Sequence, residues 1–159
     1  MSLAQKVEST LNGLTCPQVN PIHLDETEQG QRFECDLAAL DVIGCAFERF
    51  ALQSDKLQSA EIDVLRDVAD DLSKRLTYLL EPIQAIEVDS QQCTVQMRSV
   101  PPSKTDDRTS YYELLVRKGG ELILRRWAAD YGSGRQVILA QVTREVFLRL
   151  VRDFSAAAA

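Results

Sequence analysis

One histidine, His23, is all that the sequence offers as a conventional catalytic base. A serine triad needs such a base beside its nucleophile, and we expect His23 to be a surface residue in an irregular polar segment. The chain also has no Gly-rich phosphate loop, no HExxH pair and no G-x-S-x-G turn. These absences exclude the common enzymes that such motifs define. We therefore expect no catalytic residue, although the sequence leaves enzymatic activity open.

Clusters of metal ligands and long apolar runs are also missing. The four cysteines form no CxxC pair and no group with the histidine, so we expect no metal site and no cofactor. No run is apolar enough to span a membrane, and residues 1–6 lack the apolar core of a signal peptide. We expect a cytoplasmic protein with buried, reduced thiols. The alternative is a redox pair, with Cys35 facing Cys45 across a hairpin.

Charge is present in quantity, and it is unevenly distributed. Residues 1–90 carry 7 Lys and Arg against 17 Asp and Glu, whereas residues 91–159 carry 11 against 7. The chain as a whole has a net charge of −6 and a pI of about 4.8. This overall acidity disfavours nonspecific nucleic-acid binding. The asymmetry bears on partners and association rates rather than on the fold.

Hydrophobic periodicity predicts three helices. Residues 3–14 have an apolar stripe at helical spacing. Residues 60–81 repeat apolar side chains at spacings of three and four, with Ser59 as a plausible N-cap and Pro82 as the stop. Residues 143–154 begin with a threonine cap and place apolar side chains on one face. The middle segment is the strongest of the three and predicts a long central helix.

Several segments between the helices predict strands. Alternation over residues 33–37 indicates a half-buried strand, and residues 43–52 fit either its returning partner or a helix. A turn at Ser90-Gln91 predicts a hairpin that starts near residue 84 and ends near residue 97. Two polar stretches without periodicity are expected to be irregular, and the last four alanines are expected to fray. These are the connection 15–31, the mobile loop 99–110 and the tail 156–159.

Gly119-Gly120 is the clearest turn in the chain. A two-residue type I′ turn there places Lys118 opposite Glu121. Counting outward from this pair predicts one shared strand face with six residues. These are Tyr112, Leu114, Val116, Ile123, Arg125 and Trp127.

Arg125 is the unusual member of that predicted face. A charge among apolar side chains needs a partner. The partner could be a carboxylate of the chain, or an anionic ligand in a pocket lined by Trp127 and Tyr112. A third option is that Arg125 extends past the sheet edge to water.

Two further surfaces are candidates for interfaces. The other face of the same hairpin carries Leu115, Leu122 and Leu124, which a helix, a partner or a second copy of the chain must cover. The outer side of the helix predicted over residues 60–81 carries four aspartates. They form a solvated face, a docking surface for a basic partner or a weak cation site. These aspartates are Asp63, Asp67, Asp70 and Asp71.

Together these patterns predict one α+β domain over residues 1–159. We expect a mainly antiparallel sheet of about 5–7 strands, packed with the long central helix, a C-terminal helix and a short N-terminal helix. The function that fits best is non-catalytic binding of another macromolecule, as in chaperones and adaptors, or self-association. A small anionic-ligand site at Arg125 is the alternative. A basic face formed by Arg117, Arg126 and Arg135 is the weaker third option.

Overall fold

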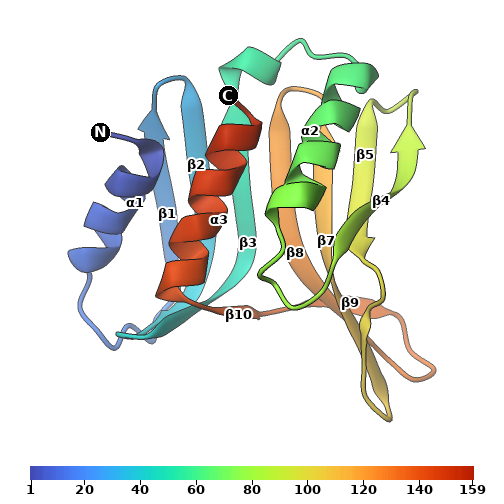
Figure 1. The fold of residues 1–159 in the computed structure, drawn as a ribbon. Helices are drawn as coiled ribbons and strands as arrows, with labels where there is room; N and C mark the ends of the chain where they lie inside the picture. Colours follow the sequence, from blue (N-terminus) through green and yellow to red (C-terminus); the bar gives the residue numbers. More distant parts are fainter.

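The computed structural model describes residues 1–159 and has three helices layered on one face of a ten-stranded antiparallel sheet (Figure 1). The predicted α+β class with an antiparallel sheet is confirmed, and the sheet has more strands than expected. The elements are α1 (Leu3–Asn12), β1 (Ile22–Glu28), β2 (Gln31–Leu40), β3 (Gly44–Ser54), a 3₁₀ turn (Asp55–Leu57), α2 (Ile62–Arg75), β4 (Ile83–Asp89), β5 (Thr94–Ser99), β6 (Ser103–Lys104), β7 (Arg108–Arg117), β8 (Glu121–Asp130), β9 (Arg135–Ile138), β10 (Ala140–Thr143) and α3 (Arg144–Ala157).

The main strands follow the order β1-β2-β3-β8-β7-β5-β4, and three short strands branch from this path. β3 pairs with β8 through residues 50–53 but with β10 through residues 44–47. β8 in turn pairs with β9 through residues 126–129. β3 and β8 therefore diverge toward one end of the molecule, and residues 135–143 cross the gap between them (Figure 1).

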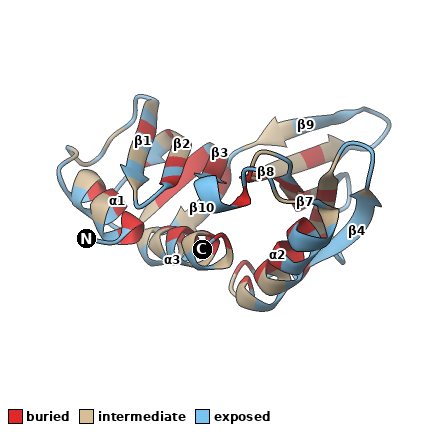
Figure 2. Ribbon diagram, turned by 90° about the horizontal axis from the view of Figure 1, so that it is seen from above, coloured by how far each residue is buried: buried red, intermediate tan, exposed pale blue.

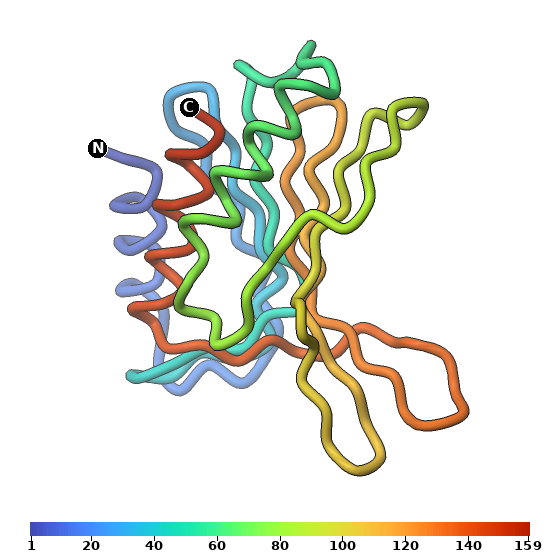
Figure 3. Tube along the Cα trace, turned by 45° about the vertical axis from the view of Figure 1, so that its right-hand side comes forward, coloured from blue at the N-terminus to red at the C-terminus, as the bar shows by residue number.

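The core lies between the sheet and the helical layer (Figure 2). All five phenylalanines are fully buried there, and α3 packs two of them on the rings of β2 and β3. Phe50 is the centre of this cluster, with ring centroids 4.9 to 5.5 Å from four neighbours, mostly edge to face. The face of the sheet away from the helices carries no such layer. Beyond the sheet, the β6–β7 hairpin and the β8–β9 turn project from the body (Figure 3).

Two of the predicted helices are confirmed closely, and the third is shorter. α1 begins with a capping box between Ser2 and Gln5, and Thr143 caps α3 by accepting from the Val146 amide. α2 has 14 residues, begins after Glu61 rather than Ser59, and ends at Arg75 rather than at Pro82. The apolar stripe continues because Leu76 and Leu79 remain buried in a non-helical segment. Periodicity alone therefore overestimates the length of this helix.

The ambiguous and irregular segments also resolve. Residues 43–52 form strand β3, not a helix, and residues 33–37 lie within β2 as predicted. The connection 15–31 was wrongly predicted, since it contains β1, and the loop 99–110 contains β6 paired with the start of β7. The tail 156–159 was expected to fray, but α3 runs to Ala157 and the Ser54 hydroxyl donates to the Ala158 carbonyl at 2.8 Å.

Both hairpin registers differ from the predicted ones. Arg117 opposes Glu121 across the three-residue loop 118–120, so the β7–β8 register is one residue away from that of a two-residue turn. Gly120 has φ +77°, and a Cβ there would lie 2.4 Å from the Ser54 carbonyl, because the loop docks on the end of β3. In the β4–β5 hairpin, Val88 opposes Val95, with an irregularity at Ile86.

Candidate functional site

The corrected β7–β8 register separates the residues predicted to share a ligand pocket. Tyr112 pairs with Arg126, and both lie on the helix-covered face. Arg125 and Trp127 lie on the other face, which is open. Arg125 makes no ion pair and no side-chain hydrogen bond. The predicted site of Arg125, Trp127 and Tyr112 is therefore not brought together.

Arg126 is the charged residue on the apolar face. Its guanidinium lies 4.5 Å from the centroid of the Tyr112 ring, and its Nη2 donates to Glu81 Oε2 at 2.9 Å and to Ser110 Oγ at 3.1 Å. Burial raises the pKa of Tyr112, although the positive charge of Arg126 opposes that shift. The expectation of a carboxylate partner thus holds for Arg126 with Glu81, not for Arg125.

Trp127 belongs to a second polar group on the open face. Glu113 is buried and accepts from Trp127 Nε1 at 3.2 Å, from Gln96 Nε2 at 2.9 Å and from Arg135 Nη1 at 3.0 Å. The Arg135 guanidinium lies 4.0 Å over the Trp127 ring and also donates to the Tyr111 hydroxyl. These bonds raise the pKa of Arg135. Both carboxylate oxygens of Glu113 therefore accept hydrogen bonds within the group.

The predicted leucine interface is also divided. Leu122 and Leu124 are fully buried under the helices, whereas Leu115 is half-buried on the open face opposite Ile123. On α2, Asp63, Asp67 and Asp70 are exposed. The fourth aspartate, Asp71, accepts from Arg75 at 2.9 Å. The leucines therefore form no common surface for a partner.

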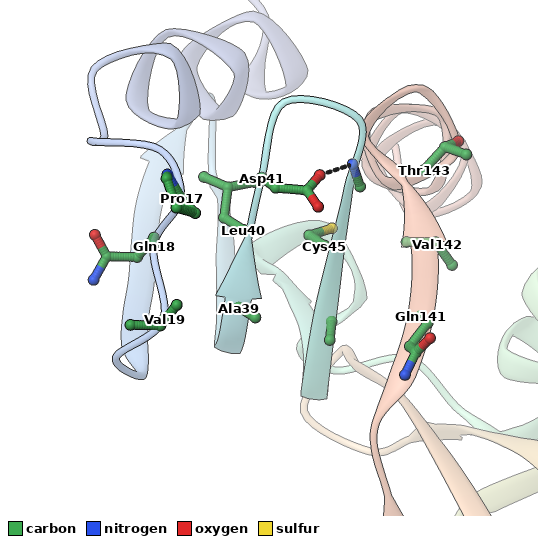
Figure 4. Close-up of a pocket in the computed structure, with 12 residues that line it drawn as sticks. Pro17, Gln18, Val19, Ala39, Leu40, Asp41, Cys45, Gln141, Val142 and Thr143 are labelled. Atoms are coloured by element: carbon green, nitrogen blue, oxygen red, sulfur yellow. Dashed lines mark hydrogen bonds between the residues drawn. The ribbon is translucent and has the colours of Figure 1, made fainter.

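A groove on one side of β10 was not anticipated from the sequence. It has a volume of about 530 Å³ and lies between the 17–19 segment, the β2–β3 turn and β10 (Figure 4). Leu40 and Cys45 lie between its two sides. Asp41 closes the turn by accepting from the Gly44 amide at 2.7 Å and the Ile43 amide at 2.8 Å, which lowers the pKa of Asp41. The groove is lined by Pro17, Gln18, Val19, Ala39, Leu40, Asp41, Gly44, Cys45, Ala46, Gln141, Val142 and Thr143.

A second groove lies on the other side of β10 and shares residues 141–143 with the first. Its volume is about 560 Å³, and it is bounded by the segment that follows α2 and by the start of α3. The Arg126–Glu81 pair and Tyr112 line it, so one predicted ligand residue does border a cavity. Tyr78 also lines it and donates to Asp153 Oδ2 at 2.7 Å, and burial raises the pKa of Tyr78.

Exposed apolar side chains gather along these two grooves. Five large ones line a groove or stand in the β2–β3 turn beside it, and each is 43% to 78% exposed except Leu80, which is 97% exposed. We call the two grooves together with these five residues the β10 surface. The residues are Val19, Val42, Ile43, Leu80 and Leu139. Sequence reasoning missed this surface because its members come from four separate connections that only the fold brings together.

Comparison with protein-family models, with curated proteins and with solved structures finds no match to this chain. None of its helices has both the length and the apolar character that a membrane crossing requires.

Proposed function

We propose that this protein is a non-catalytic binding module that holds an extended apolar segment of a partner protein on the β10 surface. The observation that carries the proposal is that three exposed large apolar side chains line two adjoining grooves, while Val42 and Ile43 are exposed in the β2–β3 turn beside the first groove. Single exposed apolar residues are ordinary, but apolar side chains that gather around a groove are typical of interaction sites. The four cysteines are free thiols, which suits the cytoplasmic location that we propose.

The backbone of β10 supports an extended ligand. β10 pairs only with β3, so its second edge has main-chain groups without a strand partner. A peptide strand could add to this edge, with main-chain hydrogen bonds providing affinity and the two grooves receiving alternate side chains. The apolar lining from Val19, Leu40 and Val142 favours aliphatic side chains on that peptide.

The small anionic ligand has weaker support. Arg126 is the cation of the second groove, and Glu81 already neutralises it at 2.9 Å. An anion would have to displace a largely buried carboxylate. The open-face arginine, Arg135, is likewise held by Glu113.

Selection of short random peptides displayed on phage, with the full chain as bait, tests the proposal. We expect enrichment of aliphatic peptides. A selected peptide should bind the V42D/I43D double variant about tenfold or more weakly. Burial of each of these side chains under a peptide would contribute roughly 1.5 kcal/mol or more to the binding free energy. Val64→Asp is the matched control, since Val64 is also exposed but lies near the start of α2, at the opposite end of the molecule from β10 (Figure 1).

Two outcomes contradict this proposal. Failure to enrich any peptide sequence argues against a peptide-binding module. Equal weakening by V42D/I43D and by Val64→Asp argues against the β10 surface. Sedimentation of the free chain identifies the competing occupant, because a dimer that V42D/I43D dissociates would mean that a second copy covers this surface.

A further inference from the structure

A group of four ionisable residues on the open face lies far along the sheet from the polar groups of β7 and β8. His23 and Asp25 are on β1, and Asp36 and Glu34 are their direct cross-strand partners on β2. Alternate residues of a strand share a face, so all four side chains project to the same side. The neighbouring positions Leu24 and Cys35 are buried under the helices, which places this group on the uncovered side.

Three side chains of this group bring their possible ligand atoms close together. His23, Asp25 and Glu34 each offer a ligand atom, and these atoms all lie within 4.8 Å of one another. We propose that these three residues bind a divalent transition-metal ion, with Zn²⁺ as the best fit. Imidazole nitrogen and carboxylate oxygen are both zinc ligands, and three protein ligands leave a coordination position for water.

Asp36 has the geometry of a positioning residue for this site. Its Oδ1 lies 2.8 Å from His23 Nδ1, while His23 Nε2 lies 3.2 Å from Glu34 Oε1. A hydrogen bond from Nδ1–H to Asp36 fixes the tautomer that leaves Nε2 free to bind a metal. Metal-binding histidines regularly donate their second nitrogen to a carboxylate in this way. Asp36 therefore holds the imidazole so that His23 Nε2 points toward the carboxylate of Glu34.

Arg32 competes with a metal for the same carboxylates. Its Nε and Nη2 donate to the two oxygens of Asp25 at 2.9 and 2.6 Å, and Nη2 lies 3.5 Å from Glu34 Oε1. A bound metal requires this guanidinium to move away. Arg32 is half-exposed, so its guanidinium can turn into solvent once its ion pair with Asp25 breaks. Arg32 should consequently weaken metal binding, so its removal should raise the metal affinity rather than lower it.

Titration of the full chain with zinc chloride, followed by calorimetry and by NMR of the imidazole, tests this site. His23 is the only histidine, so its ring signals report one position without ambiguity. We expect one equivalent of Zn²⁺ to shift these signals. His23→Gln and Asp36→Asn should each lower the affinity by about tenfold or more. Arg32→Gln should raise the affinity, since it removes the competing cation.

Zinc binding by thiols is the main confounding process, and a matched variant controls for it. Cys16 and Cys93 are the two half-buried cysteines, and the C16S/C93S variant should retain the tight site. Full zinc affinity in His23→Gln would overturn the proposal, as would imidazole signals that do not move. Because the four side chains lie on the surface, the circular dichroism spectra of the variants should match that of the parent, which excludes unfolding as the cause of any loss.

Discussion

On each face of the β7–β8 hairpin, an arginine, an aromatic ring and a glutamate come together, with partners from β9 and from the segment after α2. On the helix-covered face, Arg126 stacks on Tyr112 and pairs with Glu81, and the two charged side chains are only 15% and 13% exposed. On the open face, Arg135 stacks on Trp127, and Glu113 is 6% exposed while Arg135 is 43% exposed. Water can replace a lost partner only for Arg135. Loss of the carboxylate should therefore cost more stability in the covered group than in the open-face group, because only the open-face arginine can hydrate.

The largest difference between the faces should appear in apolar packing. Phe50→Ala removes a ring that packs edge to face on three other rings, and it should lower the free energy of unfolding by about 3–5 kcal/mol. Leu115→Ala, on the open face, should cost about 1–2 kcal/mol because its side chain is only half-buried. Urea unfolding followed by tryptophan fluorescence measures both. Equal losses would mean that something also covers the open face.

The Arg126–Glu81 and Arg135–Glu113 pairs should differ less in the stability that is lost when each glutamate is removed. Glu81→Ala leaves Arg126 beside Tyr112 with little access to water, and it should cost about 2–3 kcal/mol, near the range for a broken buried pair. Glu113→Ala removes an acceptor of three hydrogen bonds, but its partner Arg135 can hydrate, so the loss should be about 1–2 kcal/mol. Chemical denaturation of the two variants in the same buffer tests the order. A larger loss for Glu113→Ala would reverse the assignment of the stabilising face.

These two groups also show how far the sequence could be interpreted. An arginine on an apolar strand face needs a partner, and the sequence left open whether a carboxylate, an anionic ligand or water provides it. A one-residue error in register placed Arg125 on that face instead of Arg126. Gly119-Gly120 fits both a two-residue and a three-residue loop. The choice depends on the contact between Gly120 and the end of β3, which is distant in sequence. Local pattern therefore predicts that a hairpin exists, while tertiary contact determines which side chains share a face.

Other errors have related causes. β1 was missed because acidic residues occupy both of its faces, and Glu26 lies on the side that faces α1. The end of α2 was missed because Leu76 and Leu79 continue the helical spacing after the helix has stopped. The helices that carry their own caps and a complete apolar stripe, α1 and α3, were predictable to within two or three residues. The β10 surface was not, since no single segment contains it.

The smallest expected effect is at Leu80, where substitution by glycine should change the stability of the fold and the affinity for peptides in opposite directions. It is 97% exposed and has φ +66°, a backbone conformation that a side chain with a Cβ adopts at a cost. Leu80→Gly removes this strain, and it loses almost no buried apolar area because the side chain is exposed. It should therefore raise the free energy of unfolding by about 0.5–1 kcal/mol. The same change removes an apolar side chain from the second groove, so the selected peptides should bind more weakly.

Leu80→Ala separates the two contributions, because it removes the side chain but keeps the strained backbone. It should weaken peptide binding as much as Leu80→Gly does and leave the unfolding free energy unchanged. Thermal and urea unfolding, together with peptide titrations, measure both quantities on the same samples. If Leu80→Gly is more stable and binds peptides as well as the parent chain, the exposed leucine has no part in the site. If stability rises while binding falls, the chain maintains a strained leucine at the groove at the expense of folding, which is the relation expected of a residue retained for binding.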